Sequence, residues 1–131
     1  MKLWMSAEFE GGLGDQIRAS RNFVEDEINK EIESKSYGVE LKGWDCIIIL
    51  MRDDPNFDEV IKYSKKKQDM DFRLKIDFDD FSKTTALGQQ KLIYQMLDRS
   101  LDLLIEQGVS SEGINVLRSD VIKVAEKNNW V

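Results

Sequence analysis

The side chains that could do chemistry in this chain are carboxylates, lysines, tyrosines and one thiol, because the 131 residues include no histidine. Catalysis by Ser-His-Asp or Cys-His groups, histidine general-base chemistry and histidine-ligated metals are therefore excluded. The thiol, Cys46, begins the apolar run Cys46–Met51. Burial there would raise its pKa and suppress its reactivity. We therefore expect no catalytic residue and predict that the protein is not an enzyme.

Three aspartates, Asp77, Asp79 and Asp80, are the group most similar to a divalent-metal site, since hard cations prefer carboxylate oxygens. No second acidic motif with ligand spacing accompanies them. Two of them share the polar face of a predicted strand with basic residues, and ion pairs across that face explain the same pattern. We expect no metal and no cofactor. A small carboxylate-dependent metal-binding protein or enzyme that uses these aspartates is the alternative function.

Two further motifs could contact phosphate groups. Gly12–Gly14 lies between a predicted strand and a predicted helix, but Ile17 occupies the place of the third glycine of a dinucleotide-binding loop. Lys65–Lys67 is followed at once by Asp69, in a chain that is acidic overall. A turn and a solvated loop explain these motifs, and we expect no nucleic-acid partner.

The bulk composition limits the class of protein. The length suits one domain over residues 1–131, and a single cysteine cannot form an internal disulfide. The longest apolar run has six residues, whereas a bilayer span needs about 20. These features predict a cytoplasmic protein with no membrane partner. The net charge of −6 disfavours nucleic acid and favours a basic partner.

Hydrophobic periodicity predicts the elements that position these side chains. Period-2 alternation or continuous apolar character predicts strands over residues 3–9, 39–51, 58–65 and 71–79. Helical spacing predicts a first helix from about Asp15, with Ile17, Val24, Ile28 and Ile32 inward and Phe23 widening this apolar stripe. A second helix follows Thr84 or Thr85 and ends before Gly108, and a third follows Ser110 or Ser111.

The order of these elements is β-α-β-β-β-α-α. A run of strands in the middle of the chain favours an antiparallel four-stranded sheet with helices packed on one face, which is an α+β fold. An exposed edge strand could pair with a second copy, so the expected state is a monomer or weak homodimer.

Several segments, spread over nearly the whole chain, are similar to the immunity protein 44 family of bacterial polymorphic toxin systems. They are Leu3–Glu8, Arg21–Glu25, Gly43-Trp44, Phe72–Asp77, Ser100–Leu104 and Leu117–Val121. The resemblance implies an α+β immunity protein that acts in contact-dependent growth inhibition. Such a protein binds the C-terminal domain of its cognate toxin in the cytoplasm and neutralises it by stoichiometric inhibition. Many such toxin domains are basic nucleases, so the resemblance implies a partner of that type.

Two acidic regions are the candidate contacts with such a toxin. One is the outer face of the first helix, with Glu25, Asp26, Glu31 and Glu33. The other is the turn region with Asp53, Asp54, Asp58 and Glu59. Negative charge at these positions would speed association with a basic domain. Solvated surface acids without any partner explain the same residues.

Overall fold

The structure is a computed structural model that describes residues 2–8, 14–37, 46–52, 60–64, 69–75, 81 and 83–131. The strands of the described part are β1 (Lys2–Glu8), β2 (Cys46–Arg52), β3 (Val60–Ser64) and β4 (Asp69–Lys75). The long helices are α1 (Gly14–Ile32), α3 (Ala86–Glu106) and α4 (Ser111–Lys127).

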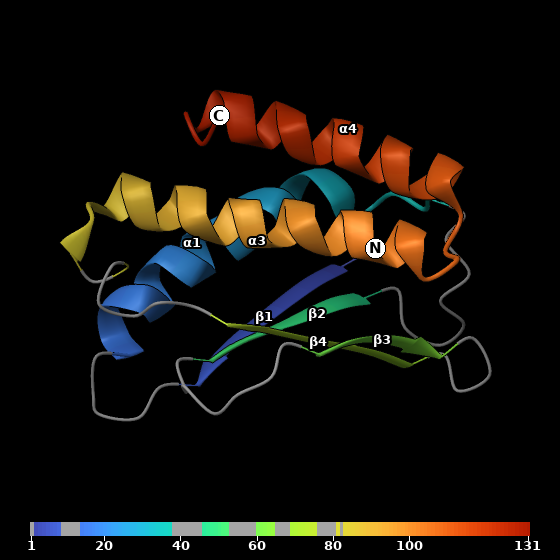
Figure 1. Cartoon of the computed structure of the whole chain (residues 1–131). Coiled ribbons are helices and arrows are strands. Elements are labelled where there is room, and N and C mark those ends of the chain that lie inside the picture. Colours follow the sequence, from blue (N-terminus) through green and yellow to red (C-terminus); the bar gives the residue numbers. More distant parts are fainter. Residues whose placement is uncertain are drawn as a thin grey trace.

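The four strands form one mixed sheet in the order β1-β2-β4-β3. Strand β1 pairs with β2 in parallel, with Lys2 opposite Cys46 and Glu8 opposite Arg52. Strand β2 also pairs with β4 in parallel, whereas β3 and β4 pair antiparallel. The two central strands, β2 and β4, therefore run in the same direction as β1, and the edge strand β3 runs against them (Figure 1).

The predicted α+β fold with an antiparallel sheet is wrong, because two of the three strand pairings are parallel. Helix α1 lies between β1 and β2 in the chain, and a strand-helix-strand connection returns the second strand parallel to the first. Strand β4 then takes the place beside β2 and leaves β3 at the edge. The apolar run in β2, continuous over Ile47–Met51, is typical of a central parallel strand.

The three long helices lie on one side of the sheet (Figure 1). Helix α1 contacts β1, α3 and α4, and α3 also contacts α4. In Figure 1, α4 lies farther from the sheet than α1 and α3 do. Helix α1 is thus the element that joins the sheet to the outer helices. No helix among the described residues is long and apolar enough to cross a bilayer.

The described core is built from one apolar stripe on each helix. On α1, Val24, Ile28 and Ile32 recur every fourth residue and are at most 1% exposed, as the periodicity predicted. The prediction that Phe23 widens this stripe is wrong, because its side chain is exposed. The counterparts of the α1 stripe on α3 are Ile93, Leu97, Leu101 and Leu104, and those on α4 are Ile114, Leu117, Val121 and Val124. These buried stripes explain why three amphipathic helices pack together rather than remaining separate.

One buried polar bridge crosses this core. The Ser20 hydroxyl of α1 donates to Gln89 Oε1 of α3 at 2.6 Å, and Gln89 Nε2 donates to the Phe81 carbonyl at 3.3 Å. Each polar group therefore has a partner, which removes most of the cost of burying it. The bridge fixes how α3 lies along α1.

The ends of α3 have well-defined caps. Thr85, one of the two predicted cap residues, accepts a hydrogen bond from Gly88 N at 3.1 Å. At the other end Gly108 has a φ of 92°, and its N–H donates to the Ile105 carbonyl. Val109 N donates to the Leu104 carbonyl at 3.0 Å, which completes a Schellman motif. The predicted role of Gly108 as the residue that ends α3 is confirmed.

Helix α4 ends in the same motif with asparagine in the left-handed position. Asn129 has a φ of 59°, and its N–H donates to the Glu126 carbonyl. Trp130 N then donates to the Ala125 carbonyl at 2.8 Å. Asparagine tolerates this conformation better than most residues, so the chain turns back and places Trp130 against the helices.

The left-handed conformation of Gly108 predicts the result of substituting it. Gly108→Ala should lower the free energy of unfolding by about 1–2 kcal/mol, because a side chain at positive φ is strained. Gly108→Asn should lower it less, because asparagine tolerates this region. Urea unfolding followed by circular dichroism measures both. Equal stability of the alanine variant and the original protein would contradict the assignment.

Candidate partner-binding surface

The four acids predicted to share the outer face of α1 lie on different sides of the helix. Asp26 lies on α1, Glu33 directly follows the last residue of that helix, and both are exposed on the same side, seven residues apart. Glu31 bonds to Lys35 Nζ at 3.0 Å and lies on the side that faces α4. Glu25 is half-buried. The structure therefore brings together only Asp26 and Glu33 of the four on the solvent-facing side.

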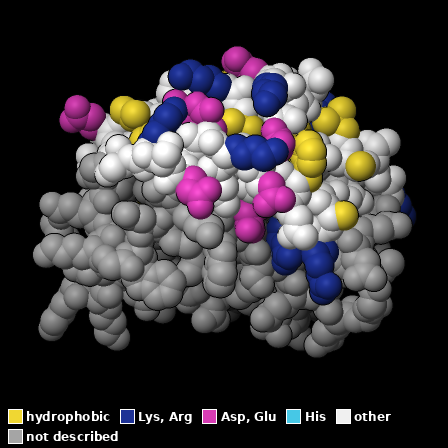
Figure 2. Space-filling view, turned by 180° about the vertical axis from the view of Figure 1, so that it is seen from behind, with side chains coloured by type: hydrophobic (Ala, Val, Ile, Leu, Met, Phe, Trp, Pro, Cys, Tyr) yellow, Lys and Arg dark blue, Asp and Glu magenta, His cyan; other side chains and the backbone are white. Residues whose placement is uncertain are grey.

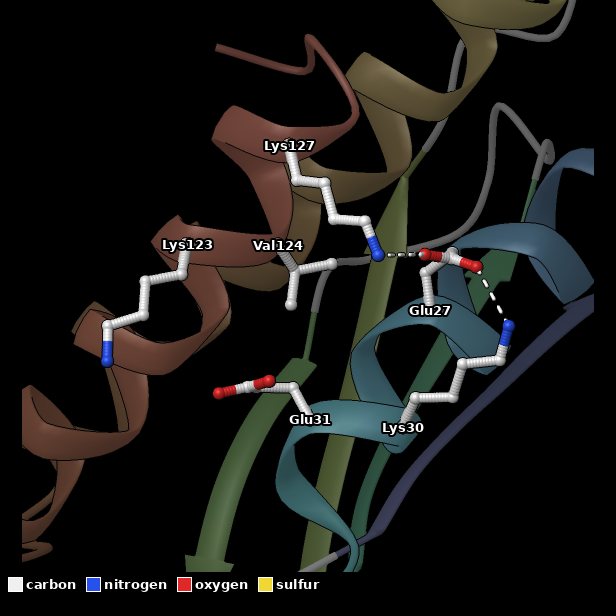
Figure 3. Close-up of a pocket in the computed structure, with 6 residues that line it drawn as sticks. All are labelled: Glu27, Lys30, Glu31, Lys123, Val124 and Lys127. Carbon is white, nitrogen blue, oxygen red and sulfur yellow. Dashed lines mark hydrogen bonds and ion pairs between the residues drawn. The ribbon is translucent and has the colours of Figure 1, made fainter.

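A groove runs between α1 and α4 and has a volume of about 190 Å³ (Figure 3). We call it the α1–α4 groove; its lining residues are Glu27, Lys30, Glu31, Lys123, Val124 and Lys127. Figure 3 shows Lys127 reaching from α4 towards Glu27, with Lys30 on the other side of that carboxylate. The groove is thus lined by carboxylates from α1 and by ammonium groups from both helices.

Glu27 is the central carboxylate of this groove. Its side chain is 15% exposed and lies 3.0 Å from Lys30 Nζ and 4.0 Å from Lys127 Nζ. The hydrogen bond from Lys30 lowers the pKa of Glu27 below its ordinary value, although partial burial opposes this shift. The two lysine side chains are 74% and 77% exposed. The Glu27 carboxylate therefore lies deep in the groove and pairs with two exposed ammonium groups, those of Lys30 and Lys127.

A second network shares Lys123 with the groove. The buried Asp120 of α4 accepts hydrogen bonds from Tyr37 Oη at 2.7 Å, from Lys35 Nζ at 3.3 Å and from Lys123 Nζ at 3.3 Å. Burial alone would raise the pKa of Asp120, but these three donors outweigh it and lower the pKa below its ordinary value. Burial, reinforced by the nearby Asp120 charge, raises the pKa of the Tyr37 hydroxyl. The network fixes the segment that follows α1 against α4.

Helix α4 is tied to α3 by a separate ion-pair group. The Arg118 guanidinium lies 3.2 Å from Asp98 Oδ1 and also pairs with Asp102, and it donates to the Asp98 carbonyl. Because the two carboxylates lie one turn apart on α3, a single side chain of α4 can reach both. Arg118 therefore links α4 to α3.

The chemistry that this arrangement supports is recognition of charge. The pKa values of Glu27, which lines the groove, and of Asp120, which bonds to the groove residue Lys123, are both lowered, so these carboxylates are poorly suited to general-acid work. Within the described residues no group of three or more histidine, cysteine, aspartate or glutamate side chains could hold a metal ion.

The remaining predicted site residues lie outside the described part of the chain. They are Asp53, Asp54, Asp58 and Glu59 of the acidic turn region, and Asp77, Asp79 and Asp80 of the alternative metal site. Cys46 is the first residue of β2.

Reasoning from the sequence missed the groove, although its pattern was present. Glu27 and Glu31 lie four residues apart on α1, and Lys123 and Lys127 lie four residues apart on α4. Residues at this spacing share one side of a helix, so each pair could have been expected to face a single partner. The sequence does not say that the two sides face each other.

Comparison with known proteins gives one result. A family model described as Immunity protein 44 matches residues 1–127. No curated protein and no solved structure matches the chain.

The hydrogen bond between Tyr37 and Asp120 predicts a difference between two tyrosines. Tyr37→Phe should lower the free energy of unfolding by about 1.5–3 kcal/mol, because the bond is to a charged group and is buried. Tyr94→Phe is the matched control, since Tyr94 is also buried but its hydroxyl makes no hydrogen bond with a described residue. Chemical denaturation of both variants measures the difference. Losses of the same size would show that the bond contributes little.

The lowered pKa of Asp120 predicts how stability depends on pH. A carboxylate whose pKa is lower in the folded state stabilises the fold above its ordinary value of 3.8, and this contribution is lost as pH falls through the lower folded value. Asp120→Asn should therefore cost about 1–3 kcal/mol at pH 7 and progressively less as the pH falls below about 4. Unfolding titrations of both proteins from pH 7 to pH 2.5 test this. A cost that does not change with pH would exclude the proposed charge network.

Proposed function

The chain belongs to the immunity protein 44 family, and from that premise we propose that it binds a cognate toxin domain and neutralises it by stoichiometric inhibition. The match over residues 1–127 carries this proposal, because it covers all the described elements from β1 to α4. The partner is the C-terminal domain of a polymorphic toxin of a contact-dependent inhibition system. Binding takes place in the cytoplasm, and neither nucleic acid nor membrane takes part in it.

The acidity of the chain supports a basic, nuclease-type toxin as the partner. The net charge is −6, and opposite charges on two proteins raise the rate at which they associate. A nuclease domain carries basic groups where it binds phosphates. An acidic inhibitor can occupy those groups directly or can block access from an adjacent surface.

The proposed contacts are acidic residues of α1 and of residues 53–59. On α1, Asp26 and Glu33 are the best placed of the four predicted acids, because both are exposed and neither forms an ion pair or side-chain hydrogen bond with a described residue. Glu31 is already paired with Lys35, so it would have to exchange that partner. Asp53, Asp54, Asp58 and Glu59 remain contact candidates from the sequence.

Charge reversal tests the α1 contact. Asp26→Lys with Glu33→Lys should lower the association rate constant with the toxin domain by about tenfold at low ionic strength, because both substitutions remove steering charge and add repulsion. The difference should shrink as salt is added. Stopped-flow or biolayer measurements with the C-terminal domain of the toxin encoded beside this gene give the rate constants.

The control is a pair of reversals with the same change in net charge. Glu106→Lys with Glu112→Lys alters exposed acids near the loop that joins α3 to α4. This pair should slow association much less than the α1 pair. Equal rates for the two double variants would show that net charge alone matters and would remove Asp26 and Glu33 from the interface.

A further inference from the structure

Exposed apolar side chains gather at one end of the helical layer. Four large hydrophobic residues are exposed among the described residues: Phe23, Leu87, Val116 and Val131, at 41, 40, 53 and 67%. All except Val116 belong to segments that meet around Trp130, and we call Phe23, Leu87, Trp130 and Val131 the aromatic end. Figure 2 shows hydrophobic side chains collected towards the right of the view, the side on which α3 begins and the chain ends.

Contacts to Trp130 bring these segments together. The Phe23 ring of α1 meets the indole edge-on, with 6.5 Å between ring centroids. Gln90 Oε1 of α3 accepts a hydrogen bond from Trp130 Nε1 at 3.0 Å. Leu87 lies three residues before Gln90 on the same side of α3, and Val131 directly follows Trp130. One helix turn of α1, one of α3 and the C-terminal residues therefore share a single surface.

This surface is held rigidly before any partner arrives. Trp130 is only 2% exposed, and it packs on Tyr94 at 6.1 Å as well as on Phe23. Its backbone N–H completes the Schellman motif at the end of α4. Binding of a partner here would order few side chains of this protein, so a larger part of the free energy of the contacts contributes to affinity.

The charges beside the aromatic end are of two kinds. Asp26 lies three residues from Phe23 on α1 and has no ion pair with a described residue. Of the cations on α1, Arg21 donates to Asn22 Oδ1 at 3.0 Å and Lys30 is paired with Glu27, which also pairs with Lys127 of α4. On the α3 edge, Lys83 and Lys91 lie four residues before and after Leu87, and neither has an ion pair with a described residue. Asp26 thus offers a negative charge beside Phe23, and Lys83 and Lys91 offer positive charges beside Leu87.

We infer that the aromatic end is the apolar anchor of the toxin interface, an inference that rests on the proposed function. The toxin domain presents an apolar side chain that packs against Phe23, Leu87 and Val131. A basic side chain beside it reaches Asp26. An acidic group on the opposite side would meet Lys91 and fix the orientation of docking.

The division of roles follows from the physics of interfaces. Exposed charges mainly change how fast two proteins meet, whereas a small, well-packed apolar cluster mainly changes how long they stay together. We therefore expect substitutions of the α1 acids to change mainly the association rate constant. Substitutions at the aromatic end should change mainly the dissociation rate constant.

The experiment compares uncharged substitutions, so that steering does not change. Leu87→Gln and Phe23→Gln remove apolar surface at the aromatic end, and Val116→Gln removes it from a more exposed site on α4. The probe is the purified C-terminal domain of the toxin encoded beside this gene. Each aromatic-end variant should raise the dissociation rate constant by about tenfold or more with little change in the association rate constant. The Val116 variant should stay within about threefold of the original protein.

Two additional measurements test whether each variant folds and whether the toxin domain binds near Trp130. Thermal melting verifies that each variant folds, and ¹⁹F NMR of protein labelled with 5-fluorotryptophan follows Trp130, assigned through Trp130→Phe. Addition of the toxin domain to the original sequence should shift the Trp130 resonance. A complex that forms with no shift, and with equal dissociation rates for the Leu87 and Val116 variants, would overturn the inference and leave the proposed function intact.

Two other results would also overturn it. Absence of any complex between the original protein and the toxin domain would remove the proposed function and the inference together. Sedimentation analysis tests the alternative that the aromatic end binds a second copy of this chain. A dimer that Leu87→Gln converts to a monomer, with unchanged affinity for the toxin domain, would assign the aromatic end to self-association.

Discussion

Helix α1 has to contact three neighbours at once, and most features of this surface depend on that constraint. It contacts β1, α3 and α4, so most of its circumference is used for packing. The stripe of Val24, Ile28 and Ile32 fills the core, and Glu27 and Glu31 line the side towards α4. The side of α1 that remains exposed to solvent carries Asp26 and Lys30 in its second half. Phe23 and the residues Arg18, Ala19 and Asn22 are also exposed. A nineteen-residue helix with eight charged residues therefore offers a partner few unpaired acids.

This use of charge inside the fold explains why an acidic chain has a nearly neutral helical layer. Residues 14–37 and 83–131 together contain twelve acidic and ten basic residues, whereas the rest of the chain contains thirteen and nine. Within the helices, acids face lysines or arginines of a neighbouring turn or helix, as in Glu27 with Lys127 and Asp102 with Arg118. Such pairs add little individually when exposed, but they fix which sides of the helices meet.

The sequence predicted the helices well because their signals are local. A spacing of four residues predicted the buried positions of α1, and Thr85 and Gly108 marked the ends of α3. The direction of the strands depends on pairings far apart in the chain, and the run of three consecutive strands favoured the wrong antiparallel solution. The groove and the aromatic end could not be predicted for a similar reason. Periodicity places Glu27 and Lys127 each on one side of its helix, but only packing shows that these sides meet.

The position of Trp130 shows how a local signal can have a distant effect. A left-handed asparagine after α4 is a short-range feature, yet it directs the following residue onto α1 and α3. The resulting surface combines an apolar centre, which excludes water, with charges at its edges that form no ion pair with a described residue and can orient a partner. The Schellman motif, Gln90 and the two aromatic neighbours already hold the indole in place. Binding there would therefore require little rearrangement of the helices, so this end of the layer suits a long-lived contact better than the mixed charges of the groove do.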